Sequence, residues 1–130
     1  RNTNPHVVFE GPFPNQQIGR ILAQADVVVV PSIVYENCPM AILEALYARR
    51  PVVTSNVGGM AELIQDGVNG LTFRVGDADH LAEKVRFLAQ NREALRAYQR
   101  NIKPPRTMED VAADVEACYR ELIKGRGAKG

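Results

Sequence analysis

Two glutamates, Glu36 and Glu44, are the residues of this chain best placed to do chemistry, and seven residues separate them. Glu44 falls inside an expected helix whose first turn opens on the loop that carries Glu36. A carboxylate at that position can accept two hydrogen bonds from a vicinal diol such as a ribose. Glu36 would lie beside the same ligand at a different depth. The alternative is that both are ordinary solvated acids.

Backbone amides at two expected helix starts add a second kind of chemistry. The amides of Cys38–Ala41 suit a phosphate or an anionic sugar phosphate, because the first N–H groups of a helix have no partner within it. Gly58 and Gly59 open another helix and allow close backbone approach, although a tight strand-to-helix turn would also explain them. A nucleotide diphosphate attached to a sugar would satisfy the carboxylates and the amides together. Cys38 itself is interpreted as a passive small residue rather than a reactive thiol.

The elements that position these residues alternate between strands and helices. Short apolar runs predict buried strands at residues 7–9, 27–30, 51–54 and 71–73, and the second run, entirely valine, suits a central strand buried on both faces. Such alternation predicts an α/β fold, a Rossmann-like parallel sheet with flanking helices. Ligands bind outside the carboxyl ends of the strands in these sheets. That position nominates residues 11–13, 31–38 and 55–59.

The second half of the chain is expected to be helical. Asp77 and Asn91 are interpreted as helix N-caps, and Thr107 with Asp110 forms a capping-box pattern. The last helix carries apolar residues at helical spacing, and among them Cys118 is expected in the core. Residues 125–130, Gly-rich and basic, are expected to be a flexible tail. We therefore expect one partial nucleotide-sugar-binding domain over residues 1–124.

Bulk composition excludes several classes of protein. The 130 residues carry a formal net charge of +1, and aromatic residues make up only 6%. These values do not favour nucleic acid as a partner. The two cysteines have no metal-like spacing, and His6 and His80 have no partners in sequence that suggest a metal or a triad. We therefore expect the chain to bind no metal.

The chain resembles a known family over roughly residues 7–88. The pattern VVVVPS-x3-EN-x-P-x4-EA followed by PVVTSNVGGMAELI-x-DG-x-NGL-x-F-x-x-GD is similar to the C-terminal donor-binding half of the retaining glycosyltransferases of family 4, also called group 1. These enzymes have the GT-B architecture, two Rossmann-like domains with the active site between them. The resemblance implies transfer of a glycosyl unit from a nucleotide diphosphate-sugar to a hydroxyl acceptor, with no cofactor and generally no metal.

The resemblance also implies roles for single residues. Glu44 matches the glutamate that binds the donor ribose, and Glu36 matches the catalytic glutamate beside the donor sugar and its leaving phosphate. The loop whose amides touch the donor sugar and phosphate comprises Asn37, Cys38, Pro39 and Met40. The segment that contacts the nucleobase through its backbone corresponds to Gly11–Phe13, with Phe13 as the contact. Ser32 and the pair Gly58 and Gly59 would line the same mouth.

Some residues depart from the family pattern. Many members carry Gly-Phe-Gly where this chain has Asn37-Cys38-Pro39, and Arg50 stands where Gly is usual. The family's diphosphate-binding Arg and Lys, and its acceptor-binding N-terminal domain, are not in these residues. The resemblance therefore implies an incomplete C-terminal half of a GT-B glycosyltransferase that alone should be inactive, its acceptor being bound by the missing domain.

The missing strands have a structural consequence. In the order 3-2-1-4-5-6, residues 7–9 would form strand three and residues 27–30 strand four, with strands one and two absent between them. We predict that either the 7–9 strand moves or another copy of the chain covers the exposed edge by self-association.

Two other functions stay open as alternatives. One is a non-catalytic α/β interaction module, which should show an acidic pocket at the strand ends. The other is a sugar-nucleotide epimerase fragment of the same architecture, which would need a His in the cleft. The expected location is the cytoplasm, with peripheral contact to a membrane as a variant because basic chain ends can approach anionic lipid.

Overall fold

The computed structural model describes residues 4–127, and three parallel strands lie at the centre of the fold. The strand order is β1-β2-β3, with β1 at Val28–Val30, β2 at Val52–Ser55 and β3 at Gly70–Phe73. Val28 pairs with Val52, and Val52 pairs with Gly70. Each strand ends at the same edge of the sheet, so the loops that follow β1 and β2 begin side by side. The parallel α/β fold expected from the alternating pattern is confirmed.

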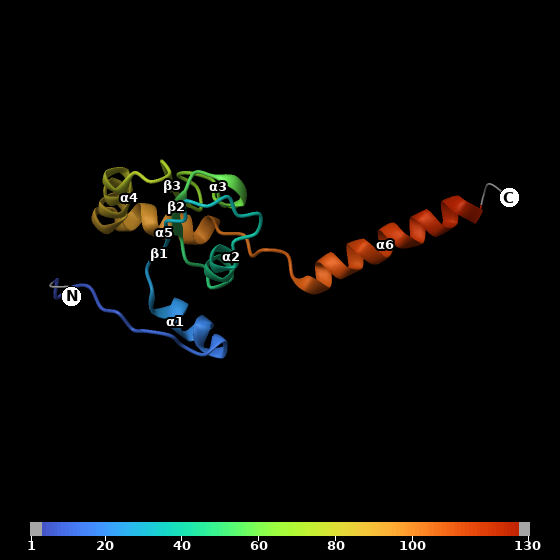
Figure 1. Ribbon diagram of the computed structural model, residues 1–130, viewed down its shortest axis with the longest axis horizontal. Helices are drawn as coiled ribbons and strands as arrows, with labels where there is room; N and C mark the ends of the chain where they lie inside the picture. Colours follow the sequence, from blue (N-terminus) through green and yellow to red (C-terminus); the bar gives the residue numbers. More distant parts are fainter. Residues whose placement is uncertain (1–3, 128–130) are drawn as a thin grey trace.

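Helices cover both faces of this sheet (Figure 1). The helices of the described residues are α1, α2, α3, α4, α5 and α6 at Ile18–Gln24, Met40–Tyr47, Gly58–Leu63, Ala78–Gln90, Arg92–Asn101 and Met108–Gly127, and a 3-10 turn, η1 at Asn15–Gln17, precedes α1; α6 takes no part in covering the sheet. On one face, buried residues of α2 and α3, among them Ile42, Leu46 and Met60, pack around Val52. On the other face, Leu88 and Tyr98 from α4 and α5 pack around Val53, Leu71 and Phe73. The central strand β2 is thereby buried at every position.

The first and second expected strands differ from the structure. Residues 7–9 form no strand, and the side chains of Val8 and Phe9 are 70% and 82% exposed. The prediction of a buried strand is wrong because the neighbour it would pair with is not among these residues. For the same reason β1 lies at an open edge, and Val29 is 41% exposed instead of being buried on both faces. Coverage of this edge by a second copy stays a prediction.

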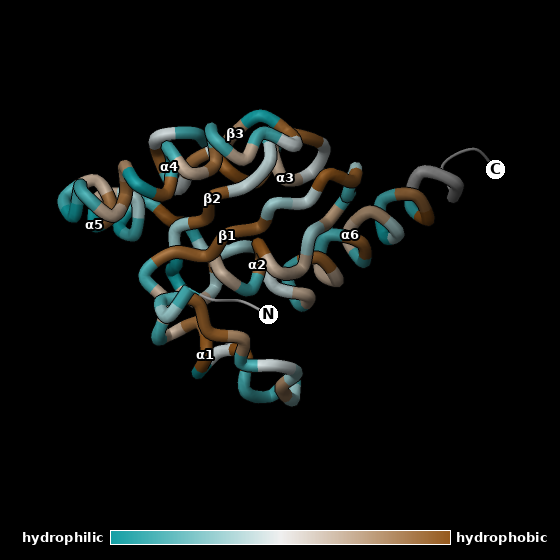
Figure 2. The backbone as a smooth tube through the Cα atoms, turned by 60° about the vertical axis from the view of Figure 1, so that its left-hand side comes forward, coloured by the Kyte–Doolittle hydropathy of each residue, from teal (hydrophilic) through white to brown (hydrophobic). Residues whose placement is uncertain are grey.

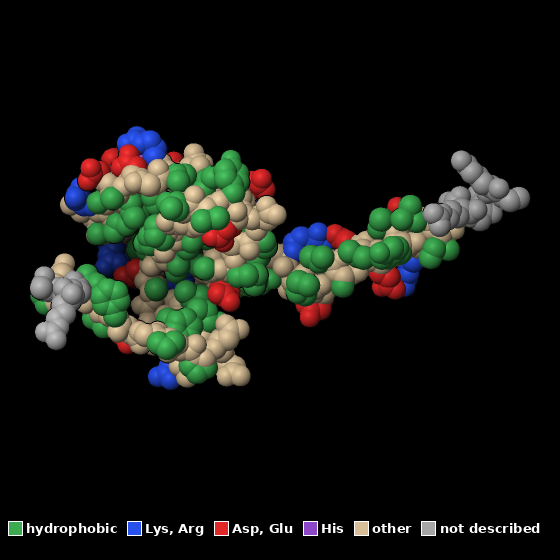
Figure 3. All heavy atoms as spheres, viewed as in Figure 1, with side chains coloured by type: hydrophobic (Ala, Val, Ile, Leu, Met, Phe, Trp, Pro, Cys, Tyr) green, Lys and Arg blue, Asp and Glu red, His purple; other side chains and the backbone are tan. Residues whose placement is uncertain are grey.

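The last helix projects away from the rest of the molecule (Figures 1 and 3). Its apolar residues recur along the helix, as the brown bands of α6 in Figure 2 show, and they are exposed. Cys118 is exposed as well, so its prediction as a core residue is wrong. Helical periodicity predicted the helix correctly but could not supply a surface for it to pack on. One hydrogen bond, from Tyr47 Oη to the Arg106 carbonyl at 2.8 Å, ties the segment before α6 to α2.

The helix ends confirm two of the three predicted caps. Asp77 Oδ1 accepts the His80 amide at 2.8 Å, and Thr107 and Asp110 exchange amide bonds of 2.9 and 3.1 Å. Asn91 stands at the predicted N-cap position of α5, but its side chain accepts no amide of that helix; its Nδ2 donates back to the Phe87 carbonyl at 2.8 Å. Helix α6 continues through residues 125–127, and residues 128–130 of the expected tail lie outside the described residues, so both the tail and the domain limits remain predictions.

Within the described part of the chain, no helix combines the length and the apolar content needed to cross a membrane.

Candidate functional site

The candidate site is built on the loop of residues 31–39, here called the mouth loop, which joins the carboxyl end of β1 to α2. Pro31 ends the strand, and Ser32 Oγ accepts the Val34 amide at 3.3 Å in a local turn. Pro39 is buried and stands at the N-cap of α2 with extended backbone angles, φ −71° and ψ 102°. The loop therefore begins and ends at prolines that cannot extend the neighbouring strand or donate to the helix.

Two free amides mark the start of α2. The Pro39 carbonyl accepts the amides of Ile42 and Leu43 at 3.0 and 3.3 Å. The amides of Met40 and Ala41 have no acceptor within the described residues, and no side chain caps this end. Unpaired donors at the positive end of a helix favour an anion. Among the amides of Cys38–Ala41 that the sequence predicted for a phosphate, those of Met40 and Ala41 are thus available.

The Gly58 and Gly59 pair joins the start of α3 to the mouth loop. Gly59 donates its amide to the Glu36 carbonyl at 2.8 Å. A Cβ on Gly59 would collide with the Asn37 carbonyl oxygen, and one on Gly58 would lie 3.0 Å from the Glu36 carbonyl oxygen. Gly58 also has φ +54°, a left-handed conformation that favours glycine. Close packing therefore explains both glycines, and the Gly59 amide is already used, so contact of this pair with a ligand stays a prediction.

The two glutamates lie at different places around α2. Glu36 is half-buried in the mouth loop, and Glu44 lies in the second turn of α2, where it lines a hollow of about 340 Å³ with Ile18, Leu22 and Tyr47 between α1 and α2. Neither carboxylate makes a hydrogen bond or an ion pair within the described residues. Both are therefore free to accept from a ligand, but Glu44 faces α1 in this structure instead of opening onto the mouth loop.

Other predicted residues are spread more widely. Cys38 and Met40 are exposed at the start of α2, and Asn37 is exposed beside Gly59. Gly11 and Phe13 lie in the irregular N-terminal segment, which runs past α1 and, in Figure 1, apart from the mouth loop. The structure thus brings together the residues of the mouth loop and the glycine pair, while it does not bring Gly11 and Phe13 to them.

One residue at this edge was nominated by its position only, with no chemical role predicted for it. Ser55 is the last residue of β2, fully buried, and its Oγ has no hydrogen-bond partner within the described residues. Its neighbour Thr54 is satisfied, because its Oγ1 donates to the Val30 carbonyl at 2.9 Å. The available signal was position alone, since Ser55 follows a run expected to be a buried strand.

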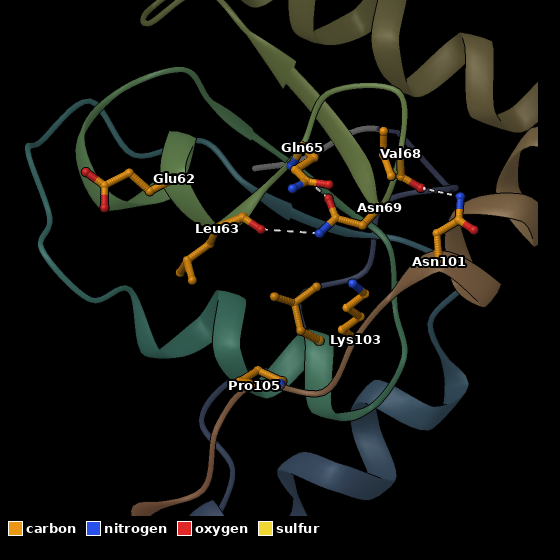
Figure 4. Close-up of a pocket in the computed structure, with 9 residues that line it drawn as sticks. Glu62, Leu63, Gln65, Val68, Asn69, Asn101, Lys103 and Pro105 are labelled. Carbon is orange, nitrogen blue, oxygen red and sulfur yellow. Dashed lines mark hydrogen bonds between the residues drawn. The ribbon is translucent and has the colours of Figure 1, made fainter. Parts of the chain in front are cut away.

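A separate hollow of about 500 Å³ lies at the opposite, amino end of the strands, between α3 and the end of α5 (Figure 4). Its two asparagine side chains are already used: Asn69 Nδ2 donates to the Leu63 carbonyl at 3.3 Å, and Asn101 Nδ2 donates to the Val68 carbonyl at 3.1 Å. These bonds fix the loop before β3, so the hollow is explained by local structure. Within residues 4–127, no group of three His, Cys, Asp or Glu could hold a metal ion; that the protein needs no metal stays a prediction.

Comparison with known proteins adds evidence of a different kind. Residues 1–91 match the family model described as glycosyl transferases group 1. The chain is similar to an uncharacterized glycosyltransferase of Methanocaldococcus jannaschii, with 42% identity over 76 residues. That match covers 58% of this chain but only 19% of the relative.

Two solved structures resemble the fold. Anabaena HepE in complex with UDP-glucose superposes with a TM-score of 0.63 at 28% identity, covering 65% of this chain and 23% of that chain. Sucrose-phosphate synthase from Thermosynechococcus elongatus superposes with a TM-score of 0.78 at 24% identity, covering 91% of this chain and 30% of that chain. The second likeness bears on the fold alone. The chain thus spans less than a third of either protein.

Proposed function

Because this chain belongs to the group 1 glycosyl transferases, with a Rossmann-like domain of the GT-B type, we propose that it forms the nucleotide-sugar donor site of a retaining glycosyltransferase. The reaction would move a glycosyl unit from a nucleotide diphosphate-sugar to a hydroxyl of an acceptor. The complex of HepE with UDP-glucose supports this class of donor. We propose that this chain binds the same class of donor, a nucleotide diphosphate-sugar, as HepE does.

One observation carries the proposal: the start of α2 offers two unpaired amides beside a glutamate whose carbonyl is held in place. The amides of Met40 and Ala41 are free, and the Glu36 carbonyl is fixed by the Gly59 amide at 2.8 Å. A diphosphate at the helix start would accept from the two amides. The Glu36 carboxylate, which has no partner among the described residues, would then lie next to the bond between sugar and phosphate.

The second glutamate would bind the nucleoside. The Glu44 carboxylate would accept two hydrogen bonds from the ribose hydroxyls. Since it faces the hollow between α1 and α2, the ribose would lie on the α1 side of α2, about one helical turn from the free amides, at 1.5 Å of rise per residue. This placement gives α1 a role at the edge of the donor site that the sequence did not indicate.

Catalysis would depend on stabilising the leaving diphosphate. Charge develops on its oxygens as the glycosidic bond breaks, and donors that are already oriented stabilise that charge most effectively. The helix-start amides would supply part of this stabilisation. The family's Arg and Lys that contact the diphosphate, and its acceptor-binding domain, have no counterpart in these residues, so we propose that this chain alone binds donor weakly and does not transfer sugar.

Calorimetry with UDP, GDP and ADP tests the donor site. We expect one nucleotide to bind saturably and Glu44→Ala to weaken that binding at least about tenfold, because hydrogen bonds to a charged group contribute about 1.5–3 kcal/mol each. Glu83→Ala on α4, which removes the same charge from an exposed helix position, should bind like the wild type. Equal affinity of Glu44→Ala and Glu83→Ala would reject the assignment.

If the chain alone binds no nucleotide, the same titration is carried out on the full-length protein. The proposal predicts binding there, again sensitive to Glu44→Ala, and failure of the full-length protein to bind any nucleotide would favour an interaction module instead. The retaining mechanism is tested by NMR of the product that the full-length protein makes, which shows whether the transferred sugar keeps its anomeric configuration.

A further inference from the structure

Four arginines surround a hollow at the amino ends of the strands, away from the mouth loop. Arg49 and Arg50 lie in the turn between α2 and β2, and Arg96 and Arg100 lie on α5. The hollow has a volume of about 490 Å³. We call it the basic hollow; its lining residues are Ala48, Arg49, Arg50, Arg96, Gln99 and Arg100.

These four arginines form no ion pair within the part of the chain that the structure describes. Four other arginines of the described residues form ion pairs, among them Arg74 with Asp77 at 2.7 Å and Arg92 with Asp26 at 3.1 Å, whereas Arg20 and Arg86 do not. Within residues 4–127, no carboxylate lies within 4.0 Å of a guanidinium nitrogen of the four that line the basic hollow. Four like charges around one hollow repel each other, weakly where solvent screens them, and a bound anion would remove that repulsion.

The backbone at Arg49 shows a second cost. The amides of Arg49 and Arg50 donate to the Leu46 and Ala45 carbonyls at 3.0 and 2.8 Å, the pattern that closes many helices with a left-handed residue. Arg49 is that residue, with φ +54°, and among the described residues it alone has positive φ without being glycine. Glycine would occupy this position without strain. The chain therefore places a large cation where the backbone favours the absence of a side chain.

Arg50 adds an unsatisfied donor. Its Nη2 donates to the Ala23 carbonyl at 2.8 Å, which holds the guanidinium between α1 and the basic hollow. Its Nε is buried and has no acceptor within the described residues. A buried donor without an acceptor costs free energy, and an oxyanion in the basic hollow would bring acceptors to this guanidinium.

A simpler explanation accounts for only part of this cluster. Cations near the carboxyl end of a helix are stabilised by the helix dipole, which suits Arg49 and Arg50 after α2 and Arg100 in the last turn of α5. Arg96 lies in the middle of α5, where the dipole has no effect of this kind. The explanation also leaves the strain at Arg49 and the unpaired Nε of Arg50 unaccounted for.

We propose that the basic hollow is a binding site for a phosphate-type oxyanion, independent of the donor site at the carboxyl ends of the strands. Guanidinium groups recognise phosphate through paired, charge-assisted N–H···O bonds. Arginines from two elements, the α2–β2 turn and α5, can contact different oxygens of one such group. The phosphate would come either from a soluble polyphosphate or from a lipid headgroup, which share this chemistry.

Amide NMR of the whole chain titrated with inorganic pyrophosphate tests the site. We expect saturable shifts at residues 48–50 and 96–100, and binding at least about tenfold weaker in the double variant Arg96→Gln/Arg100→Gln, which removes two charge-assisted contacts. The matched control is Arg20→Gln/Arg86→Gln, two exposed arginines outside the basic hollow. Both double variants lose two charges from the same net charge of +1, so a general charge effect would weaken binding equally in both.

A second variant separates the site from helix capping. Arg49→Gly should raise the melting temperature by roughly 2–4 °C, because it relieves the left-handed residue, and should weaken pyrophosphate binding in the same sample. Vesicles of phosphatidylcholine with and without phosphatidylglycerol distinguish the source of the phosphate. Binding to the anionic vesicles that is lost in Arg96→Gln/Arg100→Gln would support a lipid headgroup, and pyrophosphate binding alone would support a soluble ligand.

The proposal is overturned if neither probe binds, or if the control variant loses binding as much as the test variant. Shifts confined to residues 36–41 would likewise overturn it, since pyrophosphate would then occupy only the donor site. Nucleotide affinity should be unchanged in Arg96→Gln/Arg100→Gln, so failure of the basic hollow and failure of the donor site give different results.

Discussion

Replacing Gly59 by alanine tests how the site is held together. The new Cβ would collide with the Asn37 carbonyl oxygen and would lie 2.9 Å from the Glu36 carbonyl oxygen, so the mouth loop or the start of α3 must move. Overpacking of this kind costs roughly 1–3 kcal/mol, and loss of the bond from the Gly59 amide to Glu36 costs about 1 kcal/mol more. Alanine returns about 1 kcal/mol through its helix propensity. The net expectation is a destabilisation of about 1–3 kcal/mol.

Urea unfolding of Gly59→Ala beside Gly19→Ala measures this effect directly. Gly19 is also in a helix, has no atom within 4 Å of an added Cβ and has no positive φ. Its replacement should stabilise the chain by roughly 0.5–1 kcal/mol. If Gly59→Ala is as stable as Gly19→Ala, the glycine does not hold the mouth loop and our description of the site is wrong.

Two further perturbations follow from single contacts. Asp77 accepts the His80 amide and pairs with Arg74, and these contacts lower the pKa of its carboxyl. The stability that Asp77 contributes should therefore be present above the ordinary carboxyl pKa and disappear as the pH falls through the lowered pKa of the folded state. The Asp77→Ala variant should melt about 4 °C below the wild type at neutral pH. In strong acid the two proteins should melt at the same temperature. Ser55→Ala removes a buried hydroxyl without a partner and should stabilise the free chain by about 1 kcal/mol in urea unfolding; a loss of stability would show that Ser55 has a partner that the structure does not reveal.

Local sequence patterns predicted which segments form strands and helices better than they predicted what those segments pack against. The valine run and the Pro51–Thr54 run predicted β1 and β2, and the Asp77 cap predicted the start of α4, because strand propensity and capping act over a few residues. Residues 7–9 have an equally apolar sequence and form no strand, since a strand also needs a neighbour. The same distinction explains Cys118: its position on the apolar stripe of α6 was correct, while its burial depended on a surface outside the helix.

The candidate site shows a similar division. The prolines and glycines around Glu36 predicted a turn between a strand and a helix, and the free amides at Met40 and Ala41 follow from that turn. The bond between the Gly59 amide and the Glu36 carbonyl joins segments after two different strands, so it required the sheet register. The basic hollow was equally inaccessible to sequence reasoning, which noted Arg50 as a departure but could not bring Arg96 and Arg100 beside it.

The most direct test of the central claim is the footprint of UDP on the amide NMR spectrum of this protein, in its full-length form if the chain alone binds too weakly. We predict that the shifts concentrate at residues 36–44, with the amides of Met40 and Ala41 moving most because they would donate to the diphosphate. Saturable shifts at the basic hollow or in the loop before β3, with residues 36–44 unchanged, would contradict the assignment of the donor site to the mouth loop and α2.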